Sequence, residues 1–251
     1  VWASWGLTGG GLALGLALIF FAIRTVKFKR LMEALPTSGT QGLSFGLAEL
    51  KGMIEEEESH PPMRDPLKNE KCVAYDYRVE ERRGSGKKAK WVTIEHDTEQ
   101  VPFWLEDNHG RALIYPEGAT VEYPKHHSET RGNMRYSVKW LDTLVNVYCI
   151  GFAGLDREQP DRLALQQDKE SPFLISGRSE EDIILDRGAK GFVGTAISLG
   201  LFLFAATVML AADGSFSPDN LLLSALTVPL VLFVYIAILH YNDLVFLKNR
   251  V

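Results

Sequence analysis

Apolar residues gather along this chain in three long blocks, at residues 6–23, 191–212 and 221–239, and none of the blocks contains Asp, Glu, Lys, Arg or His. At a rise of ~1.5 Å per residue, a helix of ~18–22 residues extends roughly 27–33 Å, which matches the hydrocarbon core of a bilayer. A helix on the surface of a soluble protein would keep a polar stripe. The pattern therefore predicts three membrane-spanning helices.

The three predicted spans divide the chain into six segments. The first block could also be a signal peptide, but basic residues follow it rather than precede it, so we interpret it as an anchor. In order, we expect a first transmembrane helix at residues 1–26, a large β-rich (all-β or α+β) domain at 27–188, a second transmembrane helix at 189–212, a short extracytoplasmic loop at 213–220, a third transmembrane helix at 221–240 and the start of a further helical region at 241–251.

Basic residues at the ends of the blocks predict the orientation. If the three spans alternate, all of these residues lie on one side of the membrane, and the loop on the other side carries acids and no base. Lys and Arg accumulate on the cytoplasmic side. We therefore expect an integral membrane protein, as in a bacterial inner membrane, with its N-terminus outside and its large domain and C-terminus in the cytoplasm. The basic residues are Arg24, Lys27, Lys29, Arg30, Arg187, Lys190, Lys248 and Arg250.

Composition narrows the function classes only slightly. Charged residues make up 24% of the chain, which would suit a soluble protein if the apolar residues were not concentrated in blocks. The net charge of −5 gives no support for nucleic-acid binding. Two cysteines, Cys72 and Cys149, are too few for a disulfide framework and form no CxxC pair for zinc.

Short strand-like runs separated by turn residues fill the polar domain. The clearest is a hairpin in which residues 72–79 and 91–94 flank an exposed turn at Gly84 to Gly86. This spacing of runs and turns predicts a compact β barrel or sandwich. A capping-box-like start at Ser179 predicts a helix at 176–187 that continues into the second span. The other expected strands lie within residues 43–54, 101–105, 111–115, 136–140 and 145–152.

Candidate catalytic chemistry is scarce, and we predict no catalytic residue, cofactor or metal site. The adjacent pair His126 and His127 would point in opposite directions in a strand and could not easily chelate one ion, so we expect a polar loop there. The turn at Gly84 to Gly86 lacks the Gly-Lys-Ser/Thr ending of a phosphate loop. No Ser-His-Asp order and no nucleophile elbow stands out.

Small residues in the first block predict close helix packing. Gly11 and Gly15 are separated by three residues, a spacing that lets helix backbones approach closely. They could hold the first span against the other spans of the same chain, or they could join neighbouring subunits. We predict a homo-oligomer in the membrane.

A cluster of bases at the hairpin turn is a candidate lipid contact. It comprises Arg82, Arg83, Lys87 and Lys88. These side chains could be a solvated hairpin tip, or they could contact anionic lipid if the hairpin leans toward the bilayer.

Several ordered motifs of the polar domain resemble those of a known family. They are residues 36–42 (PTSGTQG), 46–52 (GLAELKG), 72–81 (CVAYDYRVEE), 102–107 (PFWLED), 148–151 (YCIG) and 172–176 (PFLIS). Their order resembles that of the GIDE domain, also called BAM for "beside a membrane", over roughly residues 30–190. In ubiquitin ligases of this family, the MULAN type, a zinc-binding RING module follows the second span. This chain has a third span there and no Cys/His zinc ladder, so the resemblance implies the domain without ligase activity.

The final segment resembles a second family. Residues 240–251 (HYNDLVFLKNRV) are similar to the junction where LemA-family proteins pass from a membrane helix into a helical bundle. The resemblance implies a LemA-like helical region on the same side of the membrane as the polar domain.

These observations favour a non-enzymatic membrane scaffold or adaptor. Its expected partners are the lipid bilayer, further copies of the chain and other membrane proteins. A ubiquitin-ligase-like transferase is the alternative that the family resemblance suggests. A transporter subunit is a second alternative, although ionisable residues usually mark transport pathways and the predicted spans contain none.

Overall fold

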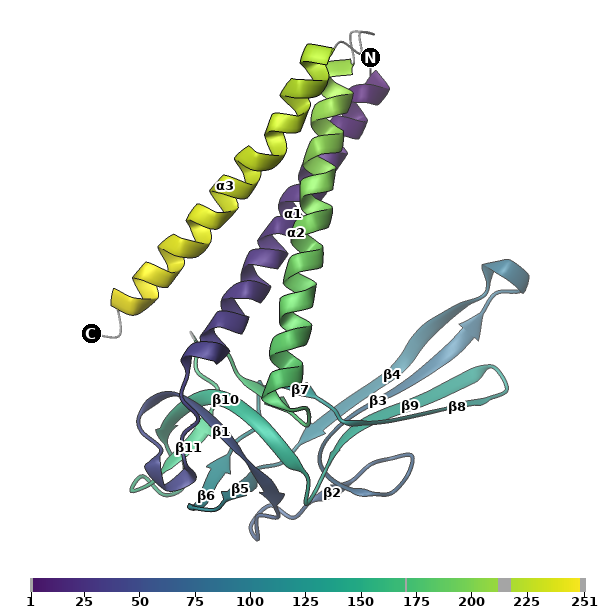
Figure 1. Cartoon of the computed structure of the whole chain (residues 1–251). Coiled ribbons are helices and arrows are strands. Elements are labelled where there is room, and N and C mark those ends of the chain that lie inside the picture. The colour runs from purple at the N-terminus through teal and green to yellow at the C-terminus, as the bar shows by residue number, and fades with distance from the viewer. Residues whose placement is uncertain (1, 170, 212–217, 249–251) are drawn as a thin grey trace. The chain divides into compact units, whose positions relative to one another are not determined.

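The structure is a computed structural model that describes residues 2–169, 171–211 and 218–248 (Figure 1). These residues form two compact units, which we call the helical unit (residues 1–34 and 181–251) and the β domain (residues 35–180). The loop predicted between the second and third spans falls largely on residues 212–217, outside the described part of the chain.

The three apolar blocks form three long helices, as predicted. They are α1 (Trp2–Ala34), α2 (Glu180–Ala211) and α3 (Pro218–Lys248). Each contains a stretch that is long and apolar enough to cross a membrane. A helix satisfies its backbone polar groups within its own segment, which the bilayer interior demands, and Pro229 in α3 removes one backbone donor from this pattern. The chain therefore has three candidate membrane-spanning helices.

A small closed barrel forms the centre of the β domain. Five strands follow one another around it, and the last pairs with the first. All neighbours are antiparallel except β6 and β11, which are parallel. In order around the barrel the strands are β1 (Gly46–Glu55), β5 (Phe103–Asp107), β6 (Gly110–Ile114), β11 (Leu163–Gln166) and β10 (Asn146–Leu155). Two short strands, β12 (Leu174–Ser176) and β7 (Thr120–Glu122), extend the sheet from β10.

Alternating side chains of the barrel strands fill its interior. Because successive side chains point to opposite faces of a strand, every second residue of β1 or β5 reaches the core. Leu50 and Phe103 are fully buried members of this core. A β-carbon added to Gly52 would lie 2.3 Å from the carbonyl oxygen of Glu106, so only glycine allows β1 and β5 to approach this closely.

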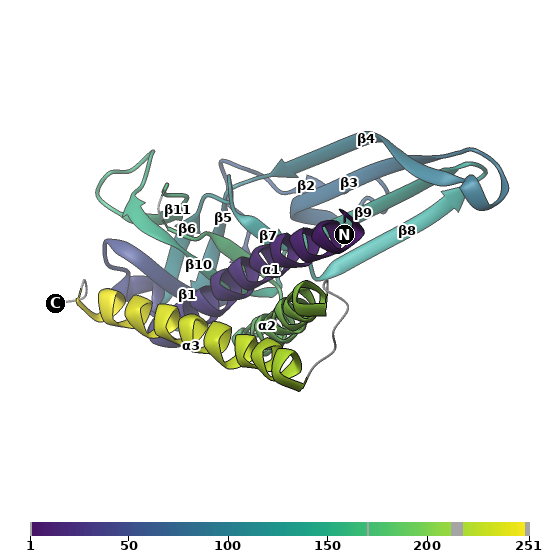
Figure 2. The ribbon, with the colours of Figure 1, turned by 90° about the horizontal axis from the view of Figure 1, so that it is seen from above.

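A second antiparallel sheet contains the predicted hairpin. Its strands are β4 (Lys90–Gln100), β3 (Lys71–Arg83), β9 (Met134–Asp142) and β8 (Lys125–Arg131), in that order across the sheet, with the short β2 (Met63–Arg64) beside the start of β3. Figure 2 shows these four long strands side by side. Within the described chain, β4 pairs only with β3 and β8 pairs only with β9, so both outer edges are free.

Most expected elements of the β domain are present. The hairpin, the strands after it and the helix that continues into the second span are confirmed, with the helix beginning at Glu180. One expectation was wrong: His126 and His127 lie in β8 rather than in a loop. β8 is an edge strand that stays largely solvated, so it lacks the apolar alternation that marks half-buried strands.

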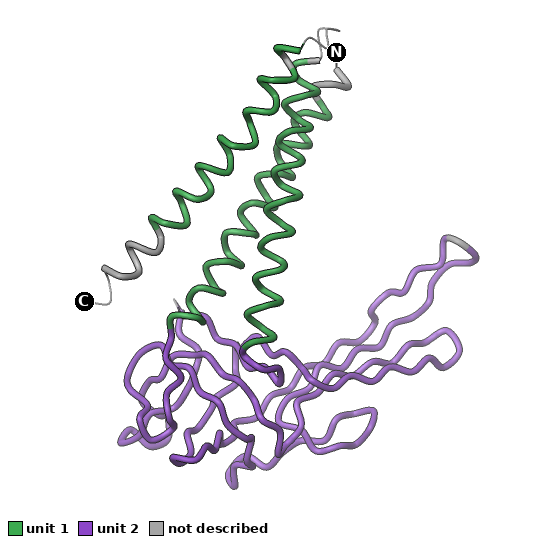
Figure 3. The backbone as a smooth tube through the Cα atoms, in the orientation of Figure 1, with its two compact units in different colours: residues 1–34, 181–251 green, residues 35–180 purple. Residues whose placement is uncertain are grey.

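Residues beside the β domain belong to the helices rather than to the sheets. The compact β domain covers residues 35–180, and the helical turns at 27–34 and 181–188 are continuous with α1 and α2 (Figure 3). The helical unit and the β domain are therefore joined by two short crossings of the chain.

Candidate interaction sites

A buried carboxylate organises the region where the chain enters and leaves the β domain. Glu49 on β1 is fully buried and accepts hydrogen bonds from the hydroxyl of Thr37 at 2.7 Å and from the phenol of Tyr148 at 2.9 Å. The ammonium of Lys51 lies 3.5 Å from Glu49 and 2.5 Å from Glu180. A buried charge is stable only when it is paired and hydrogen-bonded. These contacts join Thr37, which precedes β1, and Glu180, at the start of α2, to β1 and β10.

The electrostatics of this cluster favour a structural role. Burial raises the pKa of the Tyr148 phenol well above its ordinary value, and the hydrogen bond to Glu49 raises it further. Burial lowers the pKa of Lys51, but its contacts with Glu180 and Glu49 outweigh burial and leave that pKa raised. Tyr148 therefore stays protonated and Lys51 stays charged near neutral pH.

Both cysteines are poor nucleophiles. Cys72 and Cys149 are fully buried. Burial raises the pKa of Cys72 to about 12, with a further contribution from Asp65, and burial also raises the pKa of Cys149. The thiolate is the reactive form, so these environments fit inert core thiols. Among the described residues, no group of three or more His, Cys, Asp or Glu side chains could hold a metal ion.

The predicted basic cluster lies at the tip of the β3–β4 hairpin. Arg82, Arg83 and Lys88 are exposed there, and Lys87 lies in the short turn Gly86–Lys88, with its side chain outside the described set. Arg83 is paired with Glu81 at 2.7 Å, and the other bases keep the tip strongly basic.

The two free edges of the second sheet carry opposite charge. β4 contains three acids, one base and one histidine, whereas β8 contains one acid, two bases and two histidines. The residues are Lys90, Glu95, His96, Asp97 and Glu99 on β4, and Lys125, His126, His127, Glu129 and Arg131 on β8.

Cross-strand pairing places an acid and a base at the same level on these two edges. Glu99 pairs with Tyr75, Tyr75 with Trp140, and Trp140 with Lys125. Directly opposed residues share one face of a sheet, so the line runs from an acidic edge across two aromatic rings to a basic edge. The ammonium of Lys125 lies 5.6 Å from the centre of the Trp140 ring.

Apolar side chains are also exposed along β4. Val92 and Ile94 are 36% and 45% exposed. The register with β3 shifts between Val79 and Glu80, so Ile94 has no direct partner and forms a bulge. The β4 edge therefore offers apolar side chains together with unpaired backbone groups.

In the helical unit, α1 and α2 pack through the predicted glycines. A β-carbon on Gly11 would lie 3.4 Å from that of Ala205, and one on Gly15 would lie 3.3 Å from the Phe202 ring. The hydroxyl of Ser198 donates a 2.8 Å hydrogen bond to the carbonyl oxygen of Gly15. Both glycines therefore face α2 of the same chain.

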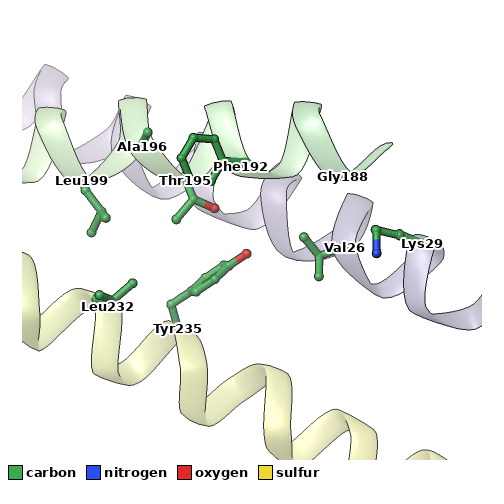
Figure 4. A pocket seen from close by; sticks show the side chains of 9 residues that line it. All are labelled: Val26, Lys29, Gly188, Phe192, Thr195, Ala196, Leu199, Leu232 and Tyr235. Carbon is green, nitrogen blue, oxygen red and sulfur yellow. The ribbon is translucent and has the colours of Figure 1, made fainter. Parts of the chain in front are cut away.

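A groove of about 420 Å³ lies among α1, α2 and α3 (Figure 4). Its walls are mainly apolar, and Lys29 lies at one end. The hydroxyl of Tyr235 points into it, while Thr195 donates its hydroxyl to the carbonyl oxygen of Gly191 at 2.8 Å. Sequence reasoning missed this groove because Tyr235 stands alone in an apolar block.

Comparison of the chain with protein-family models, with curated proteins and with solved structures finds no match. The resemblances to the GIDE and LemA families therefore rest on short motifs of the sequence.

Proposed function

We propose that the protein is a non-enzymatic membrane scaffold whose β domains assemble side by side, with the β4 edge of one copy against the β8 edge of the next. The observation that carries this proposal is the opposite charge of two free edges on one sheet. A free edge presents unpaired backbone donors and acceptors and is a template for another strand.

The strand directions suit head-to-tail assembly. Neighbouring strands of the sheet are antiparallel, so β4 and β9 run one way and β3 and β8 run the other. If a second copy lies beside the first in the same orientation, its β8 runs antiparallel to β4 and continues the sheet. Two β4 edges brought together would instead face acids with acids. Charge therefore favours a contact between the β4 edge of one copy and the β8 edge of the next, and this contact can repeat along a row of copies.

The side chains at this contact are complementary where β4 ends and β8 begins. Glu99 would face Lys125 of the neighbouring copy, because the register places them at the same level. Lys125 already contacts Asp142 at 2.5 Å and Glu70 at 3.1 Å, and its ammonium has a third donor to offer. Val92 and Ile94 would lose exposed apolar area in the same contact.

Membrane anchoring helps such an assembly. Helical spans keep all copies in one plane and in one orientation, which raises their effective concentration. The bases in the last turns of α1 and the first turns of α2 support a cytoplasmic β domain. The family resemblances add a GIDE-like domain and a LemA-like helical region on that same side.

Cross-linking tests the proposed contact directly. Thr98 and His126 lie at the same level on the two edges, and β3 and β9 separate them within one copy. In a mixture of T98C and H126C full-length proteins in mild detergent, we expect a short thiol cross-linker to join one variant to the other. Cys72 and Cys149 are buried and should not react.

The matched control replaces one edge position by a loop position. A mixture of Ser59→Cys with H126C should give no cross-linked dimer, because Ser59 lies outside both edges. A monomeric mass in mild detergent together with no link between T98C and H126C would contradict the scaffold proposal.

A further inference from the structure

The groove of the helical unit combines three features in a fixed order. Lys29 lies at one end, the Tyr235 hydroxyl follows, and apolar side chains such as Leu199 and Leu232 line the remainder (Figure 4). Its volume of about 420 Å³ is within the range of roughly 300–1,000 Å³ that is usual for small-molecule sites.

The hydroxyl of Tyr235 is the polar group that most constrains the ligand. The residue is 9% exposed, and the hydroxyl points into the groove without a hydrogen-bond partner among the residues that the structure describes. The nearby Thr195 hydroxyl already donates to the carbonyl oxygen of Gly191. A phenol in an apolar groove is unfavourable unless something accepts a hydrogen bond from its hydroxyl. A ligand with a carbonyl oxygen at this depth would satisfy it.

Lys29 indicates the charge of that ligand. Its ammonium contacts Glu33 at 2.6 Å, and two of its three donors remain. The segment from Arg24 to Ala34 contains four bases and one acid, so this end of α1 carries a net positive charge. A phosphate group at the polar end of the groove would be attracted by this charge.

We propose that the groove binds one anionic phospholipid. Its phosphate lies at Lys29, a carbonyl oxygen of a glycerol ester accepts the hydrogen bond from Tyr235, and an acyl chain occupies the apolar part between Leu199 and Leu232. The phospholipid carries these groups in the same order as the groove does. In Figure 4 the Tyr235 oxygen lies on the side of the ring toward Val26, which is one helical turn from Lys29 and so only ~4.5 Å along the axis.

This assignment is independent of the proposed sheet-edge assembly. It concerns residues of α1, α2 and α3 only. A lipid held in the groove would also brace α3 against the other two helices, because the acyl chain fills space that no side chain occupies.

Native mass spectrometry of the full-length protein tests the site. The protein is prepared in mild detergent with phosphatidylglycerol or phosphatidylcholine added as the probe. We expect one phosphatidylglycerol to stay bound after other lipids are stripped, in preference to phosphatidylcholine. Tyr235→Phe removes only the hydroxyl and should weaken retention of phosphatidylglycerol about fivefold. Lys29→Gln should reduce the preference for phosphatidylglycerol over phosphatidylcholine.

Tyr241→Phe is the matched control, because Tyr241 is 68% exposed and does not line the groove. It should bind phosphatidylglycerol as the unmodified protein does, and an excess of inorganic phosphate should not displace the lipid. The proposal is overturned if both lipids are retained equally, if Tyr235→Phe and Tyr241→Phe behave alike, or if phosphate alone competes. An unchanged thermal transition for Tyr235→Phe would show that lost retention does not come from unfolding.

Discussion

The phenol oxygen of Tyr148 lies 2.9 Å from a carboxylate oxygen of Glu49, and the two residues are 2% and 0% exposed. The bond joins β10 to β1, the two strands that close the barrel. Thr37, which precedes β1 and lies close to the end of α1, donates to the other oxygen of Glu49. One carboxylate therefore joins barrel closure to the segment that leads in from the membrane.

Removing the phenol should destabilise the protein. Tyr148→Phe leaves one oxygen of the buried Glu49 without its donor, so we expect the free energy of unfolding to fall by about 2 kcal/mol. Denaturant unfolding of the full chain in detergent, followed by tryptophan fluorescence, measures the change. Tyr136→Phe is the control: Tyr136 is only half-buried, and its loss should stay within about 0.5 kcal/mol. Equal effects of the two variants would contradict the role given to Glu49.

Asp107 should make part of the stability depend on pH. Burial raises the pKa of this carboxyl, but hydrogen bonds from Thr40, His109 and Gly110 outweigh burial and lower it to about 2 from the ordinary 3.8. The folded state therefore favours the charged form. The contribution of Asp107 to the free energy of unfolding is complete above the ordinary pKa of the carboxyl and is lost as the pH falls toward 2. The amount is at most about 2 kcal/mol.

Asp107→Asn checks this linkage. The variant should be less stable than the parent at pH 7, and the difference should narrow as the pH falls from about 4 to 2. The measurement is the free energy of unfolding against pH. Asp161→Asn changes an exposed carboxyl and should leave the curve of the parent unaltered. A constant difference between parent and Asp107→Asn across that window would show that another group carries the pH dependence.

The membrane spans were predictable because the bilayer imposes one requirement on every residue of a span. The backbone must be satisfied within a helix, and the side chains must be apolar, so local composition is sufficient. The hairpin was predictable for a similar reason, since turn residues at Gly84 and Gly86 adjoin two β-rich runs. Local rules decide these elements.

Barrel closure and the binding features depend on distant residues. Leu50 pairs with Cys149, 99 positions further along the chain, and no local pattern announces that contact. Glu49 resembles a surface acid in the sequence, and only folding buries it. Its one signal was an acid between the apolar residues Ala48 and Leu50. Tyr235 gave a comparable signal, as one phenol within an apolar block.

Gly15 should tolerate no large side chain. A β-carbon there would lie 3.3 Å from the Phe202 ring, and the hydroxyl of Ser198 bonds to the Gly15 carbonyl at 2.8 Å. We expect Gly15→Leu to force α1 and α2 apart and to reduce the free energy of unfolding by about 2 kcal/mol. Titration with sodium dodecyl sulfate in mixed micelles, followed by circular dichroism, measures the loss.

Gly9 supplies the control for Gly15, because nothing lies within 4 Å of a β-carbon added there. Gly9→Leu should keep the helical unit intact. If Gly9→Leu instead lowered the mass of the assembly in mild detergent, small residues of α1 would be contacting a neighbouring copy. If both variants unfolded alike, the packing of Gly15 against α2 would not explain its small size.

A charge reversal on the β4 edge should weaken assembly, and an opposite change of charge on the β8 edge should restore it. Asp97 lies at the level of His127, two residues from Lys125, so Asp97→Lys would place a base against the basic edge of the neighbouring copy. We expect the dimer dissociation constant in mild detergent to rise about tenfold. Adding His127→Glu should restore it. Higher salt should reduce both effects, because exposed charges are screened.

The control makes the same change of net charge away from the edges. Glu58→Lys lies in an exposed loop and should leave the dissociation constant unchanged. Sedimentation in mild detergent distinguishes the cases, since it reports mass without requiring activity. Weakening by Glu58→Lys as strong as that by Asp97→Lys would mean that net charge, rather than the two edges, controls association. Failure of His127→Glu to restore assembly would mean that β4 pairs with a surface other than β8.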